Sequence, residues 1–68
     1  MQTQYDLVKV EGLRGAKYAV RKRVKGFLFR GEYFLCVDDG IPVGYSEEMS
    51  NAWYGSKKQA EKLLKIES

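Results

Sequence analysis

The feature that most constrains the fold of this chain is a turn signal between two apolar runs. Asp38-Asp39-Gly40 separates residues 33–37 from residues 41–45. An Asp-Gly pair suits the positive φ angles of a tight hairpin turn, so the two runs are predicted to be antiparallel neighbours. Pro42 lacks the N–H that a central strand must donate, which places the second run at an edge of the sheet.

Residues 17–25 are predicted to form a further strand. Tyr18, Val20 and Val24 fall on one face and alternate with residues of the other, a period of two that is typical of a half-buried strand. A helix is the alternative, because apolar residues also recur here at steps of three and four. The residues in that second pattern are Leu13, Ala16, Val20, Val24 and Phe27.

The two ends of the chain carry further local signals. The β-branched run at residues 5–10 predicts a first strand, and residues 12–15 predict the turn that follows it. Near the C-terminus, Ser56 and Gln59 have the spacing of a capping box, which marks the start of a helix. Apolar residues then recur at helical steps.

Together these elements predict one α+β domain over residues 1–68, in which a small antiparallel sheet of three or four strands has the C-terminal helix packed on one face. Residues 27–37 are the apolar centre of the sequence. The predicted core consists of Tyr18, Val20, Val24, Leu35, Val37, Ala60, Leu63 and Leu64. Nine aromatic residues are more than so small a core holds easily, and the candidates for exposure are Phe34, Trp53 and Tyr54.

The residue types give no support to an enzyme, a cofactor or a metal site. The chain has no histidine, the commonest general base and metal ligand. Its one cysteine, Cys36, is predicted to be a buried and inert side chain. The sequence contains neither of the glycine-rich phosphate-binding motifs, G-x-x-x-x-G-K-[ST] and G-x-G-x-x-G. A divalent cation held by the acidic residues is the less favoured alternative to a solvated acidic loop.

The same features indicate a compartment. A single cysteine permits no disulfide within the chain, which favours a reducing environment. No apolar run approaches the ~18 residues that span a bilayer, and residues 1–4 lack the apolar segment of a signal peptide. We therefore expect a cytoplasmic protein, without membrane association, of a size that suits a phage or mobile element.

The charges are segregated along the sequence. Residues 14–30 contain seven Lys or Arg and no Asp or Glu, whereas residues 32–55 contain five acids and no Lys or Arg. On a strand, Lys17, Arg21, Arg23 and Lys25 would project from one face. Their i,i+2 spacing of about 6.6–7 Å is close to that of phosphates along a nucleic-acid strand. The alternative is a solvated face whose cations pair with acids on the neighbouring strand.

A second cationic feature lies at the predicted helix start. Lys57 and Lys58 sit in the first turn, where the helix macrodipole already presents positive charge. An anion docked at residues 55–58 would remove this repulsion. A tolerated mismatch on the surface is the alternative.

Two patches of the sequence resemble a known family. Tyr18-Ala19-Val20-Arg21-Lys22-Arg23 and the stretch from Trp53-Tyr54-Gly55 through Leu64 are similar to the AP2-like and arm-binding N-terminal domains of phage-type tyrosine recombinases. The resemblance covers about twenty residues. It implies DNA binding by a three-stranded sheet that enters the major groove, with a helix bracing it from behind. By that resemblance Arg21 and Arg23 would face the groove.

Two functions follow as hypotheses, and neither gives the oligomeric state. The leading one is nucleic-acid binding, in which phosphate contacts position the protein without reading sequence. Its contact residues are Lys17, Arg21, Arg23, Lys25, Arg30, Lys57 and Lys58. The alternative is a phage-type inhibitor or adaptor that binds a host nucleic-acid enzyme. Its contact residues are Asp38, Asp39, Glu47, Glu48, Trp53 and Tyr54.

Overall fold

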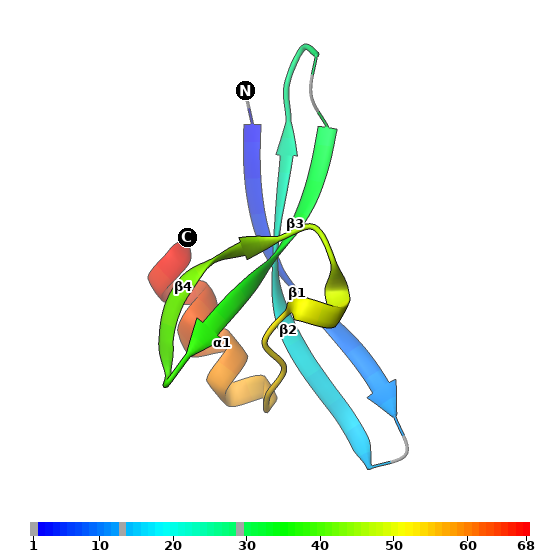
Figure 1. Ribbon diagram of the computed structural model, residues 1–68, viewed down its shortest axis with the longest axis vertical. Helices are drawn as coiled ribbons and strands as arrows, with labels where there is room; N and C mark the ends of the chain where they lie inside the picture. The colour runs from blue at the N-terminus through cyan, green and yellow to red at the C-terminus, as the bar shows by residue number, and fades with distance from the viewer. Residues whose placement is uncertain (1, 13, 29) are drawn as a thin grey trace.

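The chain forms a four-stranded antiparallel meander followed by a helix. The computed structural model describes residues 2–12, 14–28 and 30–68. The strands β1 (Gln2–Gly12), β2 (Gly15–Lys25), β3 (Arg30–Asp38) and β4 (Ile41–Ser46) lie in the order β1-β2-β3-β4. A short 3₁₀ helix, η1 (Met49–Asn51), and the helix α1 (Lys57–Glu67) complete the fold (Figure 1). The predicted α+β class is confirmed.

β2 is the long central strand of this sheet, so the strand prediction for residues 17–25 is confirmed and the helical alternative is wrong. Its register with β1 runs from Gly12 opposite Gly15 to Gln2 opposite Lys25. Because β2 is paired with β1 along its whole length, the sheet and not a helix satisfies the backbone N–H and C=O groups of this segment. Leu13, which belonged to the helical pattern, lies outside the described residues.

The predicted hairpin between β3 and β4 is present. Asp39 has φ 54° and Gly40 has φ 76°, which are the left-handed conformations of a two-residue turn. Pro42 lies in β4, an edge strand, where its missing N–H costs the sheet no hydrogen bond. Local turn chemistry therefore fixes this half of the sheet.

The helix covers one face of the sheet. Val20, Leu35 and Ala60 are fully buried, and the other predicted core residues are half-buried. The helix is capped by Ser56, whose side chain accepts a hydrogen bond from the backbone N–H of Gln59 in a capping box, as predicted. At its other end, the Tyr45 hydroxyl donates to Glu67 Oε1 at 2.6 Å.

The opposite face is covered in part by the segment between β4 and α1. Ala19 is fully buried and Phe34, one of the three candidates for exposure, is only 5% exposed and therefore belongs to the core. The Cys36 thiol donates to the Asn51 carbonyl at 3.3 Å and is half-buried rather than buried. The centre of the sheet is thus apolar on both faces, and Phe34 is buried on the face opposite the helix.

The same segment joins the sheet between β2 and β3. The β2–β3 register runs from Arg21 opposite Phe34 to Lys25 opposite Arg30. Past that point, Tyr18 exchanges backbone hydrogen bonds of 2.8 and 3.0 Å with Gly55, and the Trp53 N–H donates to the Leu35 carbonyl at 2.9 Å. The chain therefore returns to the sheet near Trp53 before the helix starts.

The loop between β2 and β3 differs from prediction. Phe27 and Leu28 belong to the predicted apolar centre, yet they are 101% and 81% exposed. Because Lys25 and Arg30 are the last residues paired between β2 and β3, Phe27 and Leu28 lie at the tip of a hairpin, where the helix does not cover them. Phe29 lies outside the described residues.

Candidate nucleic-acid interface

Most of the predicted basic residues share one face of the sheet. Directly paired residues of antiparallel strands point to the same side. The register therefore places Asp6 and Gln4 of β1 beside Arg21 and Arg23 of β2, and Arg30 of β3 beside Lys25. This is the face opposite α1, because Tyr45, which bonds the helix, pairs with Leu35 of the other set.

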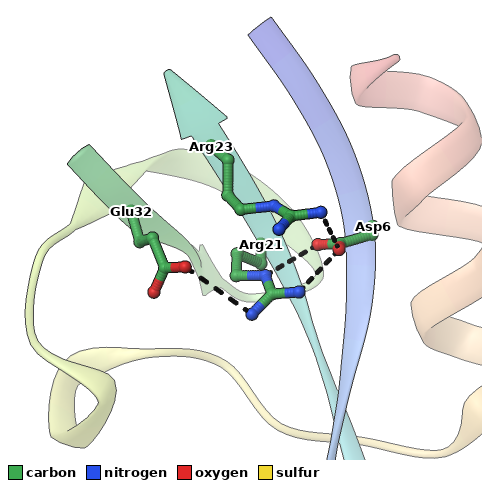
Figure 2. A network of polar contacts seen from close by, with 4 residues as sticks. All are labelled: Asp6, Arg21, Arg23 and Glu32. Atoms are coloured by element: carbon green, nitrogen blue, oxygen red, sulfur yellow. Dashed lines mark hydrogen bonds and ion pairs between the residues drawn. The ribbon is translucent and has the colours of Figure 1, made fainter. Parts of the chain in front are cut away.

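Two of these arginines are engaged by acids. The Nε and Nη2 atoms of Arg21 donate to the two carboxylate oxygens of Asp6 at 2.8 and 2.6 Å. Arg23 Nη2 donates to the same carboxylate at 3.1 Å, and Arg21 Nη1 lies 3.8 Å from Glu32 Oε1 (Figure 2). Arg21 is therefore fixed in a bidentate pair, the strongest common form of ion pair in proteins.

Electrostatics reinforce this arrangement. The hydrogen bond from Arg21 holds the pKa of Asp6 below its usual value; desolvation partly opposes the effect, and the charges of Arg21 and Arg23 add to it. The same hydrogen bond raises the pKa of Arg21. Both partners are therefore charged across the ordinary pH range. Of the two acids, Glu32 falls in the segment expected to supply partners, whereas Asp6 was not among the predicted site residues.

An open groove lies beside the ion pairs, at the start of β1, the end of β2 and the start of β3. Its volume is about 570 Å³, and it is lined by Gln2, Gln4, Arg23, Val24, Lys25, Arg30, Gly31 and Glu32. This set is named the basic groove. Three cations face one carboxylate in it, so its charge is positive. Within the described part of the chain, Lys25 and Arg30 form no ion pair.

The remaining predicted cations lie elsewhere. Lys17 is eight residues from Lys25 on β2, or about 26 Å along the strand, and lines a second hollow with Val10 and Tyr54. Lys57 and Lys58 start the helix next to Gly55, which bonds Tyr18 at that same far end. The structure thus brings Arg23, Lys25 and Arg30 together in the groove, and Arg21 is the next residue along the same face of β2. It places Lys17, Lys57 and Lys58 at the other end of β2.

The acidic residues do not gather. Asp38 and Asp39 lie at the β3–β4 turn, whereas Glu47 and Glu48 follow the other end of β4. Over residues 2–12, 14–28 and 30–68, no group of three or more metal-ligating side chains forms. Trp53 and Tyr54 are both half-buried, and the Tyr54 hydroxyl donates to the Met49 carbonyl at 2.8 Å.

Comparisons of the chain with known proteins found no match. No family model matches it, and neither the curated proteins nor the solved structures contain a significant match. These comparisons do not bear on the resemblance to recombinase domains. Among the described residues, no helix has the length and apolar character needed to cross a membrane.

Proposed function

We propose that this protein binds nucleic acid and that the basic groove contacts the phosphate backbone. The observation that carries the proposal is the pairing of Lys25 with Arg30. Like charges directly opposite each other destabilise an antiparallel pair, and within the described residues neither of these side chains has an acidic partner. A phosphate held between them would remove this repulsion.

The rest of the groove suits the same ligand. Arg23 lies two residues from Lys25 on the same face, at a spacing of about 6.6–7 Å. The amides of Gln2 and Gln4 line the groove as well and can donate to phosphate or sugar oxygens. Contacts of this kind position a protein on a nucleic acid and carry no sequence information. The proposed role is therefore binding without catalysis, and with little base preference.

Fluorescence anisotropy with a random-sequence duplex and a single strand, over a salt series, tests this proposal. Three groove cations predict that log K falls with log salt at a slope of about −3 for the duplex. Replacing Lys25 and Arg30 by Gln should lower the affinity and reduce the slope to about −1. Replacing Lys57 and Lys58 by Gln removes the same charge from the helix start and should leave the slope near −3.

Two results would contradict the proposal. One is no binding to either nucleic acid at low salt, where electrostatic attraction is strongest. The other is an equal loss in the two double variants, because net charge and not the groove would then govern binding.

The geometry gives less support to a protein-binding inhibitor. That hypothesis needs one acidic surface with aromatic anchors, since binding energy concentrates in a clustered centre. Asp38 and Asp39 are instead separated from Glu47 and Glu48 by the length of β4. We therefore place the function on the basic face of the sheet.

A further inference from the structure

The loop between β2 and β3 carries the two most exposed large apolar side chains among the described residues. Phe27 is 101% exposed and Leu28 is 81% exposed; the pair is named the hairpin tip. Figure 1 shows the β2–β3 hairpin projecting along the long axis of the molecule, away from α1. Two adjacent apolar side chains held clear of the core form an exposed apolar patch, which makes this loop a candidate interaction site.

The hairpin tip continues directly from the basic groove. Lys25 and Arg30 are the last paired residues before the loop and also line the groove. Phe27 is two residues beyond Lys25, so its backbone can reach about 7 Å further. That reach is comparable with the depth of a nucleic-acid groove, about 7.5–8.5 Å in B-form DNA. Cations at the phosphates would thus place the tip at the base pairs.

We propose that Phe27 and Leu28 form an apolar wedge that inserts between stacked base pairs of a duplex bound at the basic groove. This inference rests on the proposed function. Proteins that insert Phe or Leu side chains into a base step partly unstack it and bend the duplex. The sequence around the tip supplies both parts of such a device, the apolar wedge and the phosphate clamp behind it.

A duplex fits this end of the molecule better than an anionic bilayer does. The cations of the basic groove lie on one face of the hairpin, whereas Thr3, Val24 and Gly31 at this end share the other face and are uncharged. Lys22 also lies on that other face, further from the tip, with its Nζ 4.5 Å from the centroid of the Tyr45 ring. A hairpin that enters a bilayer meets lipid headgroups on both faces, but a duplex is contacted from one side. The groove is also hollow, which matches a rounded phosphate backbone and not a flat membrane surface.

The experiment compares two duplexes of the same length, one fully paired and one with a single mismatch, each carrying 2-aminopurine beside the test step. Unstacking is cheaper at a mismatch, so the wild-type protein should bind the mismatched duplex several-fold more tightly and increase 2-aminopurine emission. Phe27→Ser with Leu28→Ser should lose both effects, bind roughly 10-fold more weakly, and keep the salt slope near −3.

The matched control is Ile41→Ser with Val43→Ser. These side chains on β4 are 65% and 63% exposed, and the control should behave as the wild type. Thermal unfolding is the test that both variants are folded. Both should be, because the four replaced side chains are exposed.

The outcomes separate the two proposals. If the tip variant keeps the mismatch preference and the emission change while the salt slope stays near −3, the wedge is wrong and the proposed function stands. If the wild-type protein binds neither a duplex nor a single strand at low salt, the proposed function fails and the wedge fails with it. Binding to a single strand alone would leave the proposed function standing and overturn the wedge. Cosedimentation with phosphatidylserine–phosphatidylcholine vesicles that is lost in the tip variant, without any 2-aminopurine response, would also overturn the wedge and assign the tip to a membrane.

Discussion

At the scale of single residues, Asp6 determines what the basic face has available for a ligand. Its carboxylate accepts hydrogen bonds from Arg21 and Arg23, and Arg21 also lies near Glu32. Arg21, which pairs with both acids, has little charge left for a phosphate, whereas Arg23, with its single bond to Asp6, lines the groove together with Lys25 and Arg30. Asp6 thus stabilises the sheet and, in the proposed function, limits the phosphate contacts to the outer end of the basic face.

Replacing Asp6 by Asn should therefore trade stability for affinity. At pH 7 the free energy of unfolding should fall by on the order of 1 kcal/mol, because the pair is only part-buried. Affinity for a duplex should rise and the salt slope should steepen by about one, since Arg21 becomes free. Urea unfolding and anisotropy measure the two effects. A fall in affinity would show that Arg21 must be held in place for binding.

The pH dependence of this pair has a definite sign. The folded-state pKa of Asp6 is lowered, so its stabilising effect is present above the unfolded value near 3.8 and is lost as the pH falls through the lower folded value. The stability difference between the wild-type protein and Asp6→Asn should consequently shrink below about pH 3.8. A difference that stays constant down to pH 2 would contradict the ion-pair assignment.

At the scale of elements, local sequence signals correctly predicted the turns, strands and helix start that depend on neighbouring residues. The Asp-Gly turn, the alternation in β2 and the capping box at Ser56 each depend on a few neighbouring residues, and each was predicted correctly. The partner of Arg21 depends on register. In an antiparallel pair the two residue numbers have a constant sum. Because Gly12 lies opposite Gly15, Asp6 must lie opposite Arg21, so placing the turn would have been enough to predict this contact.

Other features had no local signal. Phe27 and Leu28 were included in the predicted apolar centre, residues 27–37, because they are apolar, and their exposure follows from the β2–β3 register. Phe34 is buried because the segment ending at Gly55 crosses its face and joins β2 at Tyr18. Contacts between residues this far apart in sequence are set by tertiary packing, which short patterns do not encode.

The docking of α1 on the sheet gives a prediction at this scale. The Tyr45 hydroxyl donates to Glu67, and the Tyr45 ring lies 4.5 Å from Lys22 Nζ. Replacing Tyr45 by Phe keeps the ring and removes the hydrogen bond, so the free energy of unfolding should fall by about 1–2 kcal/mol. Replacing Tyr33 by Phe is the control, because no hydrogen bond joins its hydroxyl to a described residue; it should change stability little.

This contact also has a pH dependence, in the alkaline range. Burial, followed by the hydrogen bond to Glu67 and its charge, raises the pKa of Tyr45 above 10.0. A raised folded pKa gives stability that is present below the unfolded value and lost as the pH rises through the folded one. Urea unfolding should therefore show a smaller loss between about pH 9 and pH 11 for Tyr45→Phe than for the wild type. Equal losses would place the alkaline sensitivity elsewhere.

At the scale of the whole molecule, charge is polarised along an elongated body of 40 × 23 × 17 Å. β3 starts at Arg30, beside the basic groove, and ends at Asp38, in the acidic turn. These two ends are eight residues apart, or about 26 Å, several times the screening length of about 8 Å at physiological salt. The acidic turn therefore adds little repulsion at the groove, and net charge alone describes this protein poorly.

Neutralising acids at the two places should reveal this polarity. Glu32→Gln removes one negative charge inside the basic groove, and duplex affinity should rise about three-fold, the Coulomb effect expected for charges roughly 7 Å apart in water. Asp38→Asn with Asp39→Asn removes two charges, with Asn well suited to the φ of 54° at Asp39. Its effect should nevertheless stay below two-fold at physiological salt. Anisotropy at two salt concentrations measures both variants, with thermal unfolding to establish that each is folded. A larger gain from the double variant would mean that binding follows total charge, and the assignment to the groove would then be wrong.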